Sequence, residues 1–148
     1  MPRCARSGFR LPEIVTSARF LLDRSLGGRL LVARLRDGGW DARTLAEEYG
    51  DARAQAMRDE EWISAGTQSG FILLAKDHRI ASRPLEALAI YLHDARAIAF
   101  AKGDLTATAM GDLCLQHEQA VHRLAAVQPP FVFSLGRSGL RRKHLNVP

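Results

Sequence analysis

The sequence has little cysteine and no long apolar run, and both shortages exclude classes of protein. Its 148 residues include 2 cysteines, Cys4 and Cys114, whose wide separation fits neither a disulfide framework nor the paired spacing of a zinc site. No apolar stretch is long enough to cross a bilayer, and none of signal-peptide length follows the arginines near the start. We therefore expect a cytoplasmic protein without a membrane partner.

Internal repeats and low-complexity segments are also absent, while the composition has enough apolar residues for a folded core. Hydrophobic residues make up 47% of the chain and charged residues 25%, which fits one globular domain of ordinary size. The formal net charge of +5, from 21 lysines and arginines, favours a polyanionic partner bound through its phosphates. Many basic proteins bind no nucleic acid, so charge alone leaves the partner open.

Short apolar runs alternate with longer helical patterns along most of the chain. The pattern predicts strands at 18–23, 71–75, 96–101 and 131–135 with a weaker one at 40–45, and helices at 26–37, 59–70, 82–95 and 104–127. Ser25 and Asp59 are the predicted N-caps of the first two helices, and 46–58 is predicted to be a loop with at most a helical turn. Such alternation predicts an α/β fold whose mainly parallel sheet is covered on both faces.

The two ends of the chain lack this alternation. Residues 1–17 are expected to form an N-terminal extension, and residues 18–148 to form the domain with its basic C-terminal tail. Arg137, Arg141, Arg142 and Lys143 make that tail basic. It is interpreted either as a solvated end or as an arm that contacts a nucleic acid.

Acidic residues stand where predicted strands end. Asp23 follows "FLL" and Asp77 follows "ILLAK", while Asp59 opens the helix that leads into the second of these strands. Ligands of open α/β sheets bind at the carboxyl ends of the strands, where the chain leaves the sheet for a helix. The sequence therefore predicts that three carboxylates from separate segments converge at one edge of the sheet.

Such convergence needs a compensating positive charge. Two carboxylates about 4 Å apart repel by roughly 4 kcal/mol at an effective dielectric constant near 20. A proton or a divalent cation relieves this repulsion, and an all-oxygen ligand set favours Mg²⁺ or Mn²⁺ over Zn²⁺. Because Mg²⁺ is often held by few carboxylates together with substrate phosphates, the pattern points to phosphodiester chemistry.

Three stretches, "FLLDRSLGGRLLVARLRDGGWDARTL", "RDEEWISAGTQSGFILLAKDHRI" and "QPPFVFSL", resemble in order and spacing the PIN-like domains of VapC-type toxin ribonucleases. The resemblance spans roughly residues 19–142. It implies a three-layer α/β/α fold and a Mg²⁺- or Mn²⁺-dependent endoribonuclease that cleaves RNA, is often a homodimer and is inhibited by a cognate antitoxin protein. Asp23, Asp59 and Asp77 match the acidic metal-site positions of the family, Glu60 is the alternative to Asp59, and Asp104 is the candidate for a fourth acid.

Basic residues near the predicted site are candidate contacts for an RNA phosphate. Arg79 follows Asp77, and Lys76 and Arg24 occupy neighbouring loop positions. Two rival classes stay open. One is a PIN-like module that binds nucleic acid or protein with a degenerate metal site, and the other is an acid-centred α/β protein such as a phosphatase or receiver domain.

Overall fold

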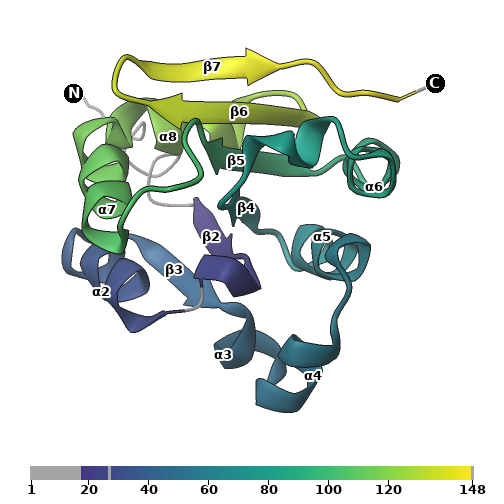
Figure 1. Ribbon diagram of the computed structural model, residues 1–148, viewed down its shortest axis with the longest axis horizontal. Coiled ribbons are helices and arrows are strands. Elements are labelled where there is room, and N and C mark those ends of the chain that lie inside the picture. The colour runs from purple at the N-terminus through teal and green to yellow at the C-terminus, as the bar shows by residue number, and fades with distance from the viewer. Residues whose placement is uncertain (1–17, 27, 148) are drawn as a thin grey trace, which may run out of the picture.

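A computed structural model describes residues 18–26 and 28–147 (Figure 1). Its six-stranded sheet has the order β3-β2-β4-β5-β6-β7. The strands are β2 (Arg19–Leu22), β3 (Asp41–Thr44), β4 (Ile72–Ala75), β5 (Arg96–Phe100), β6 (Phe131–Gly136) and β7 (Gly139–Lys143). The N-terminal extension predicted at 1–17 lies outside the described residues.

Helices and short 3-10 turns connect the strands. The α-helices are α2 (Arg29–Asp37), α3 (Leu45–Tyr49), α4 (Asp51–Ala56), α5 (Asp59–Gln68), α6 (Pro84–Leu92), α7 (Ala107–Gln116) and α8 (Glu118–Arg123). The 3-10 turns are η1 (Arg24–Leu26), η2 (His78–Ala81) and η3 (Leu124–Ala126). None of the helices within these residues is both long and apolar enough to cross a lipid bilayer.

The first five strands in chain order are parallel, and β7 alone runs antiparallel, beside β6. Parallel neighbours need crossover connections, which the helices supply, whereas a tight turn joins β6 to β7. That turn ends at Gly139, whose φ of 113° lies in the left-handed region where glycine is favoured. The mainly parallel α/β sheet predicted from the sequence is therefore confirmed.

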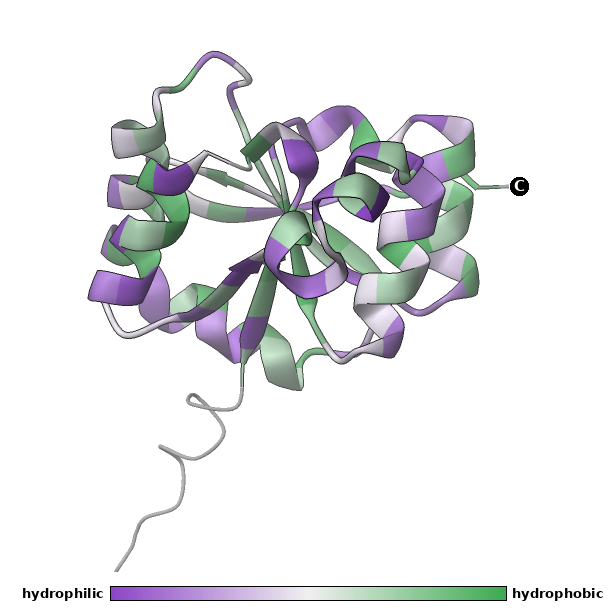
Figure 2. Ribbon diagram, turned by 90° about the horizontal axis from the view of Figure 1, so that it is seen from below, coloured by the Kyte–Doolittle hydropathy of each residue, from purple (hydrophilic) through white to green (hydrophobic). Residues whose placement is uncertain are grey.

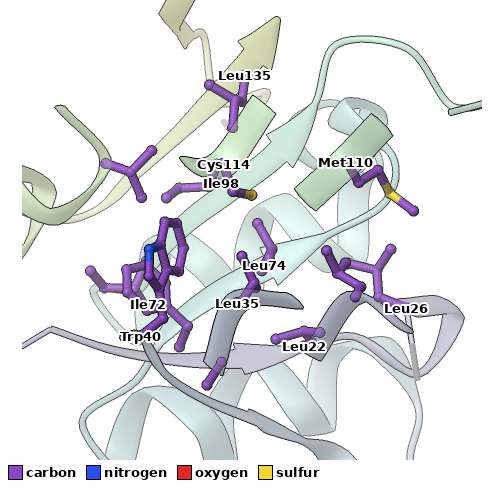
Figure 3. Close-up of a cluster of buried hydrophobic side chains, with 14 of the residues drawn as sticks. Leu22, Leu26, Leu35, Trp40, Ile72, Leu74, Ile98, Met110, Cys114 and Leu135 are labelled. Atoms are coloured by element: carbon purple, nitrogen blue, oxygen red, sulfur yellow. The ribbon is translucent and has the colours of Figure 1, made fainter. Parts of the chain in front are cut away.

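Apolar side chains cover both faces of the sheet. Helices α2, α7 and α8 pack on one face around Phe20, Leu35 and Phe131, and α3 to α6 pack on the other around Leu21 and Trp62. Figure 1 shows α2 and α7 to the left of the central strands and α5 and α6 to the right. The central strands are largely hydrophobic in Figure 2. Figure 3 shows side chains of the cluster that α2 and α7 cover. The predicted three layers follow from this two-sided burial.

The stretch predicted as a loop at 46–58 is helical instead, which corrects the prediction. Helices α3 and α4 occupy most of it. The Thr44 hydroxyl accepts the Glu47 N–H at 3.2 Å, and the Glu47 carboxylate accepts the Thr44 N–H at 2.9 Å. This reciprocal cap makes a short helix start where the apolar pattern is weak. The sequence signal was the spacing of Thr44 and Glu47, which the periodicity of apolar residues does not register.

Both predicted N-caps are wrong. Helix α2 begins at Arg29 after Gly28, and Ser25 instead donates its hydroxyl to the Asp23 carboxylate at 2.9 Å. Helix α5 begins with Asp59 itself and has Arg58 as its N-cap. Ser25 thereby holds the Asp23 carboxylate, and Asp59 is the first residue of α5.

The long helix predicted at 104–127 is divided into α7, α8 and η3, with the first break at His117. The strand predicted at 131–135 is not the last one, because the basic tail forms β7. Its polar sequence gives little apolar alternation, so periodicity alone could not identify it as a strand. Residues 139–143 of the basic tail are thus part of the sheet.

Candidate functional site

Asp23 lies at the carboxyl edge of the sheet because it continues the ladder between β2 and β4. Leu22 pairs with Leu74, and the Asp23 N–H then donates to the Leu74 carbonyl at 2.9 Å. Its carboxylate accepts the Ser25 hydroxyl at 2.9 Å and the Ser25 N–H at 3.3 Å. The side chain is therefore held in place beside the end of β4.

Asp59 reaches the same edge from α5. This helix lies close to the sheet at Gly66, where an added Cβ would be 2.7 Å from Leu73 Cδ2 and 2.8 Å from Leu21 Cδ2. Because α5 runs antiparallel to the strand that follows it, its N-terminus sits at the carboxyl ends of the strands. The close approach at Gly66 thus brings the Asp59 carboxylate toward Asp23.

Asp77 follows β4 after one intervening residue and is surrounded by arginines. Its Oδ2 lies 2.7 Å from an Arg79 nitrogen and 2.8 Å from Arg83 Nη2. Its Oδ1 accepts the Arg79 N–H at 3.0 Å, which caps η2. The hydrogen bonds from Arg79 lower the pKa of Asp77 to about 2. Asp77 is therefore an ionised carboxylate that already has two cationic partners.

One cleft of about 360 Å³ unites the three predicted acids. Its walls come from the β2 and β4 ends, the start of α5 and the first turn of α6. The lining residues are Asp23, Arg24, Ser25, Asp59, Ala75, Lys76, Asp77, Ile80, Arg83 and Glu86. Acidic and basic side chains therefore share the cleft, and four of its ten residues are acids.

Glu86 is the acid that the sequence interpretation missed. It is only 8% exposed, and its Oε1 lies 3.5 Å from Arg83 Nη1. Burial raises the pKa of Glu86, and the neighbouring charge of Asp59 raises it further. The sequence signal for Glu86 was its place on the apolar face of α6, one turn before the buried Ile90, where an apolar residue is expected. A carboxylate at such a position indicates a partner or a function.

The carboxylates repel one another inside the cleft. Burial raises the pKa of Asp23, hydrogen bonds from Ser25 oppose this rise, and the charge of Asp59 adds to it. Oxygen donors in this environment suit a hard divalent cation, because the cation replaces the repulsion by attraction. Within the part of the chain that the structure describes, no three Asp, Glu, His or Cys side chains are placed to hold one metal ion together.

Two other acids proposed from the sequence do not join the cleft. Glu60 lines a separate hollow beside α4 and α5, and its carboxylate lies 3.8 Å from Arg58. Asp104 is exposed in the turn after β5 and does not line the cleft. The structure therefore separates both residues from Asp23, Asp59 and Asp77.

The proposed phosphate contacts differ in their surroundings. Lys76 lines the cleft and forms no ion pair with another described residue. Arg24 also lines it, but its Nη1 donates to the Gln55 carbonyl at 2.7 Å and so ties η1 to α4. Arg79 is bound to Asp77. Arg83, which was not proposed, bridges Asp77 and Glu86.

Comparisons with known proteins agree with this fold. The chain matches a family model described as "PIN like domain" over residues 18–102, which is more than half of its length. It is 29% identical over 121 residues to the "Putative ribonuclease VapC45" of Mycobacterium tuberculosis (strain ATCC 25618 / H37Rv), covering 82% of this chain and 88% of that protein. No solved structure was found to match it. The resemblance to PIN-like domains is thus confirmed, and the chain belongs to the PIN-like domain family.

Proposed function

We propose that this protein is a metal-dependent endoribonuclease that acts as the toxin of a toxin–antitoxin pair and cleaves phosphodiester bonds of RNA. The observation that carries the proposal is the convergence of Asp23, Asp59 and Asp77 on one cleft at the carboxyl edge of the sheet. The matched relative is named a putative ribonuclease, which supports the same activity. RNA is therefore the proposed substrate.

Asp23 and Asp59 are the residues best placed to hold Mg²⁺ or Mn²⁺, with Asp77 as the third acid. Mg²⁺ is commonly bound through one or two carboxylates while it keeps several waters, so a set of three ligands is not required. A bound divalent ion supplies an activated water and stabilises the charge that develops at phosphorus. Asp23 is held ready by Ser25, whereas Asp77 has to turn from its arginines to join the metal.

The basic residues of the cleft orient the substrate. Lys76 lines the cleft, and its ammonium group forms no ion pair with another described residue. It is therefore the first candidate for a contact to an RNA phosphate. If Asp77 held a metal ion, Arg79 and Arg83 would each lose a carboxylate partner. The Arg79 guanidinium would then be available for bidentate binding of a phosphate, whereas Arg83 would keep Glu86 as a partner.

The test combines metal binding with cleavage. Calorimetric titration with Mn²⁺ and incubation with a pool of structured RNAs would be applied to the wild type, Asp59→Asn and Asp77→Asn. We expect the wild type to bind Mn²⁺ and cut RNA, and both variants to lose cleavage while they stay folded. Full cleavage by either variant would contradict the assignment of that acid.

Glu60→Gln and Asp104→Asn are matched controls, because each removes one carboxylate outside the cleft. Both variants are expected to keep wild-type Mn²⁺ affinity and cleavage. A loss of cleavage in Glu60→Gln alone would instead favour Glu60 as the metal ligand on α5. A loss in Asp104→Asn would restore it as the fourth acid.

One observation favours the second candidate function, a non-catalytic PIN-like binding module. Asp77 is already neutralised by Arg79 and Arg83, as expected of a site that needs no metal. Such a module would bind RNA without cutting it and would show no heat of Mn²⁺ binding. The same titration therefore separates the two functions.

A protein partner is the remaining part of the proposal, either the antitoxin or a second copy in the cytoplasm. Exposed apolar side chains gather on α6, with Leu85 65%, Leu88 38%, Tyr91 52% and Leu92 64% exposed. Apolar patches of this kind commonly mark protein interaction sites. Light scattering of the purified chain, with and without Leu85→Ser and Leu92→Ser, would show whether this surface joins two copies.

A further inference from the structure

A second hollow, of about 210 Å³, lies beyond η2 on the side of β5, β6 and β7. His78, Ser134, Ser138, Arg141 and Lys143 supply its polar lining, together with Ala101 and two glycines. No carboxylate is among these lining residues. The hollow is thus a cationic counterpart to the acid-lined cleft.

The pairing of β6 with β7 explains why two cations point into it. Ser134 pairs with Arg141 and Val132 pairs with Lys143, so all four side chains lie on the same face of the sheet. Arg142, between the two, lies on the opposite face, with its guanidinium carbon 5.4 Å from the Phe133 ring centroid. The alternation of the strand therefore separates one stacked arginine from two side chains that line the hollow.

Arg141 and Lys143 are free to bind an anion. Neither forms an ion pair with another of the described side chains, in contrast to Arg79 and Arg83, which both bind Asp77. Ser134 is 7% exposed, and its hydroxyl lies 3.5 Å from the Arg141 carbonyl. A small anion in the hollow would meet two cationic groups and hydroxyl groups without opposing negative charge.

The position of the hollow links it to the cleft. His78 lines the hollow and is the residue directly after Asp77, which lines the cleft. Strand β5 lies between β4 and β6. Because neighbouring strands are about 4.8 Å apart, the ends of β4 and β6 are about 10 Å apart. A nucleic acid strand carries regularly spaced phosphates, so one strand can present a phosphate at each place.

The C-terminal segment fixes this arrangement. After β7, the Asn146 N–H donates to the Ala81 carbonyl at 2.9 Å, and its side-chain amide donates to the Ser82 carbonyl at 3.2 Å. These bonds tie the segment after β7 to the end of η2, the turn that Asp77 caps. The segment after β7 is therefore held beside η2, whose first residue, His78, lines the hollow.

We propose that the hollow formed by Ser134, Arg141 and Lys143 binds a backbone phosphate of the RNA strand whose neighbouring segment lies in the acid-lined cleft. The proposal rests on the proposed ribonuclease function and adds a substrate-binding subsite to it. It assigns the basic C-terminal strand to positioning of RNA. Sequence selectivity is not expected of it, because phosphate contacts position the strand without reading its bases.

The test is the salt dependence of RNA binding. A fluorescent single-stranded RNA would be titrated with the full chain in EDTA, which prevents metal-dependent cleavage, at several KCl concentrations. For single strands the slope of log K against log salt falls by about 0.7 for each phosphate contact that is lost. We expect Arg141→Gln/Lys143→Gln to lose about that slope and to bind RNA several-fold more weakly at low salt.

Two variants control for charge and fold. Arg142→Gln removes a charge from the same strand on the opposite face and is expected to keep the wild-type slope. Arg141→Lys/Lys143→Arg keeps both charges and is expected to keep the slope as well. Circular dichroism would verify that each variant is folded.

The outcomes separate this inference from the function on which it rests. RNA binding by the wild type with an unchanged slope in the double Gln variant would overturn the subsite and leave the ribonuclease proposal standing. An absence of RNA binding by the wild type would overturn both. Binding of polyglutamate in place of RNA, lost in the double variant, would make the hollow an acidic-peptide site and would also overturn the inference.

Discussion

Replacement of Arg83 by glutamine is expected to change metal-free stability and metal affinity in opposite directions. Arg83 bridges two carboxylates of the cleft, with Nη2 2.8 Å from Asp77 Oδ2 and Nη1 3.5 Å from Glu86 Oε1. Arg79 also pairs with Asp77, but Arg83 is the described cation that contacts both carboxylates. Its loss leaves Glu86, which is 8% exposed, without a positive partner.

The size of the effect follows from the distance and the exposure. Unit charges 3.5 Å apart attract by about 5 kcal/mol at an effective dielectric constant near 20. Desolvation of Glu86 and the 45% exposure of the Arg83 side chain reduce this value, so we expect a net loss of about 1–2 kcal/mol in the free energy of unfolding. For a chain of this length that loss lowers Tm by roughly 2–8 °C.

Metal affinity is expected to rise in the same variant. Glu86 then has no guanidinium partner and Asp77 keeps only Arg79, so a divalent cation gains more of their attraction. Thermal and urea unfolding in EDTA measure the first effect, and Mn²⁺ calorimetry measures the second. Metal binding stabilises the folded state, so the difference in Tm between variant and wild type should shrink as Mn²⁺ is added.

Arg79→Gln is the control, because the Arg79 side chain is 69% exposed and, among the described residues, its ion pair is with Asp77 alone. It is expected to lower stability less than Arg83→Gln. The reasoning is refuted if Arg83→Gln is as stable as the wild type in EDTA, or if its Mn²⁺ affinity falls.

Three further outcomes are expected. Asp23→Asn should raise metal-free stability at pH 7, measured by urea unfolding, because burial raises the pKa of Asp23 and its charged form therefore opposes folding above that pKa. The pKa of Asp77 is lowered in the folded state, so its contribution to stability is complete above the unfolded pKa near 3.8 and is lost as pH falls toward about 2. Asp77→Asn should therefore flatten the acid-unfolding profile between these two pH values. Gly66→Ala should cost about 1–3 kcal/mol by overpacking against two buried leucines, whereas Gly103→Ala, with no atom within 4 Å of the added Cβ, should stay within about 0.5 kcal/mol of wild type.

The strands with apolar runs were predicted correctly because burial on both faces requires continuous apolar residues. The runs before Asp23 and Asp77 correspond to β2 and β4, and the common direction of parallel strands brings both acids to one edge. Strand β7 and helices α3 and α4 were missed, since polar sequence and short length leave little periodicity. Pairing with β6 stabilises β7, and a local capping box starts α3.

Glu86 shows a different limit of sequence interpretation. Its distance from the other acids along the chain conceals its place in the cleft, which depends on how α6 packs beside β4. The same is true of Arg83, whose two carboxylate partners lie on opposite sides of it in the sequence. The sequence offered only the unusual position of an acid on an apolar helix face.

The sequence by itself determined the α/β class, the approximate strands and the two acids at strand ends, because periodicity and chain direction are local properties. Tertiary structure alone decided which acids share a cleft, which arginines neutralise them and which cations of the C-terminal strand stay free. The shared cleft depends on distances between segments far apart in the chain, and the arginine pairs within residues 77–86 depend on how η2 and the start of α6 fold. Electrostatic interactions weaken with distance and exposure, so only the packed arrangement specifies them.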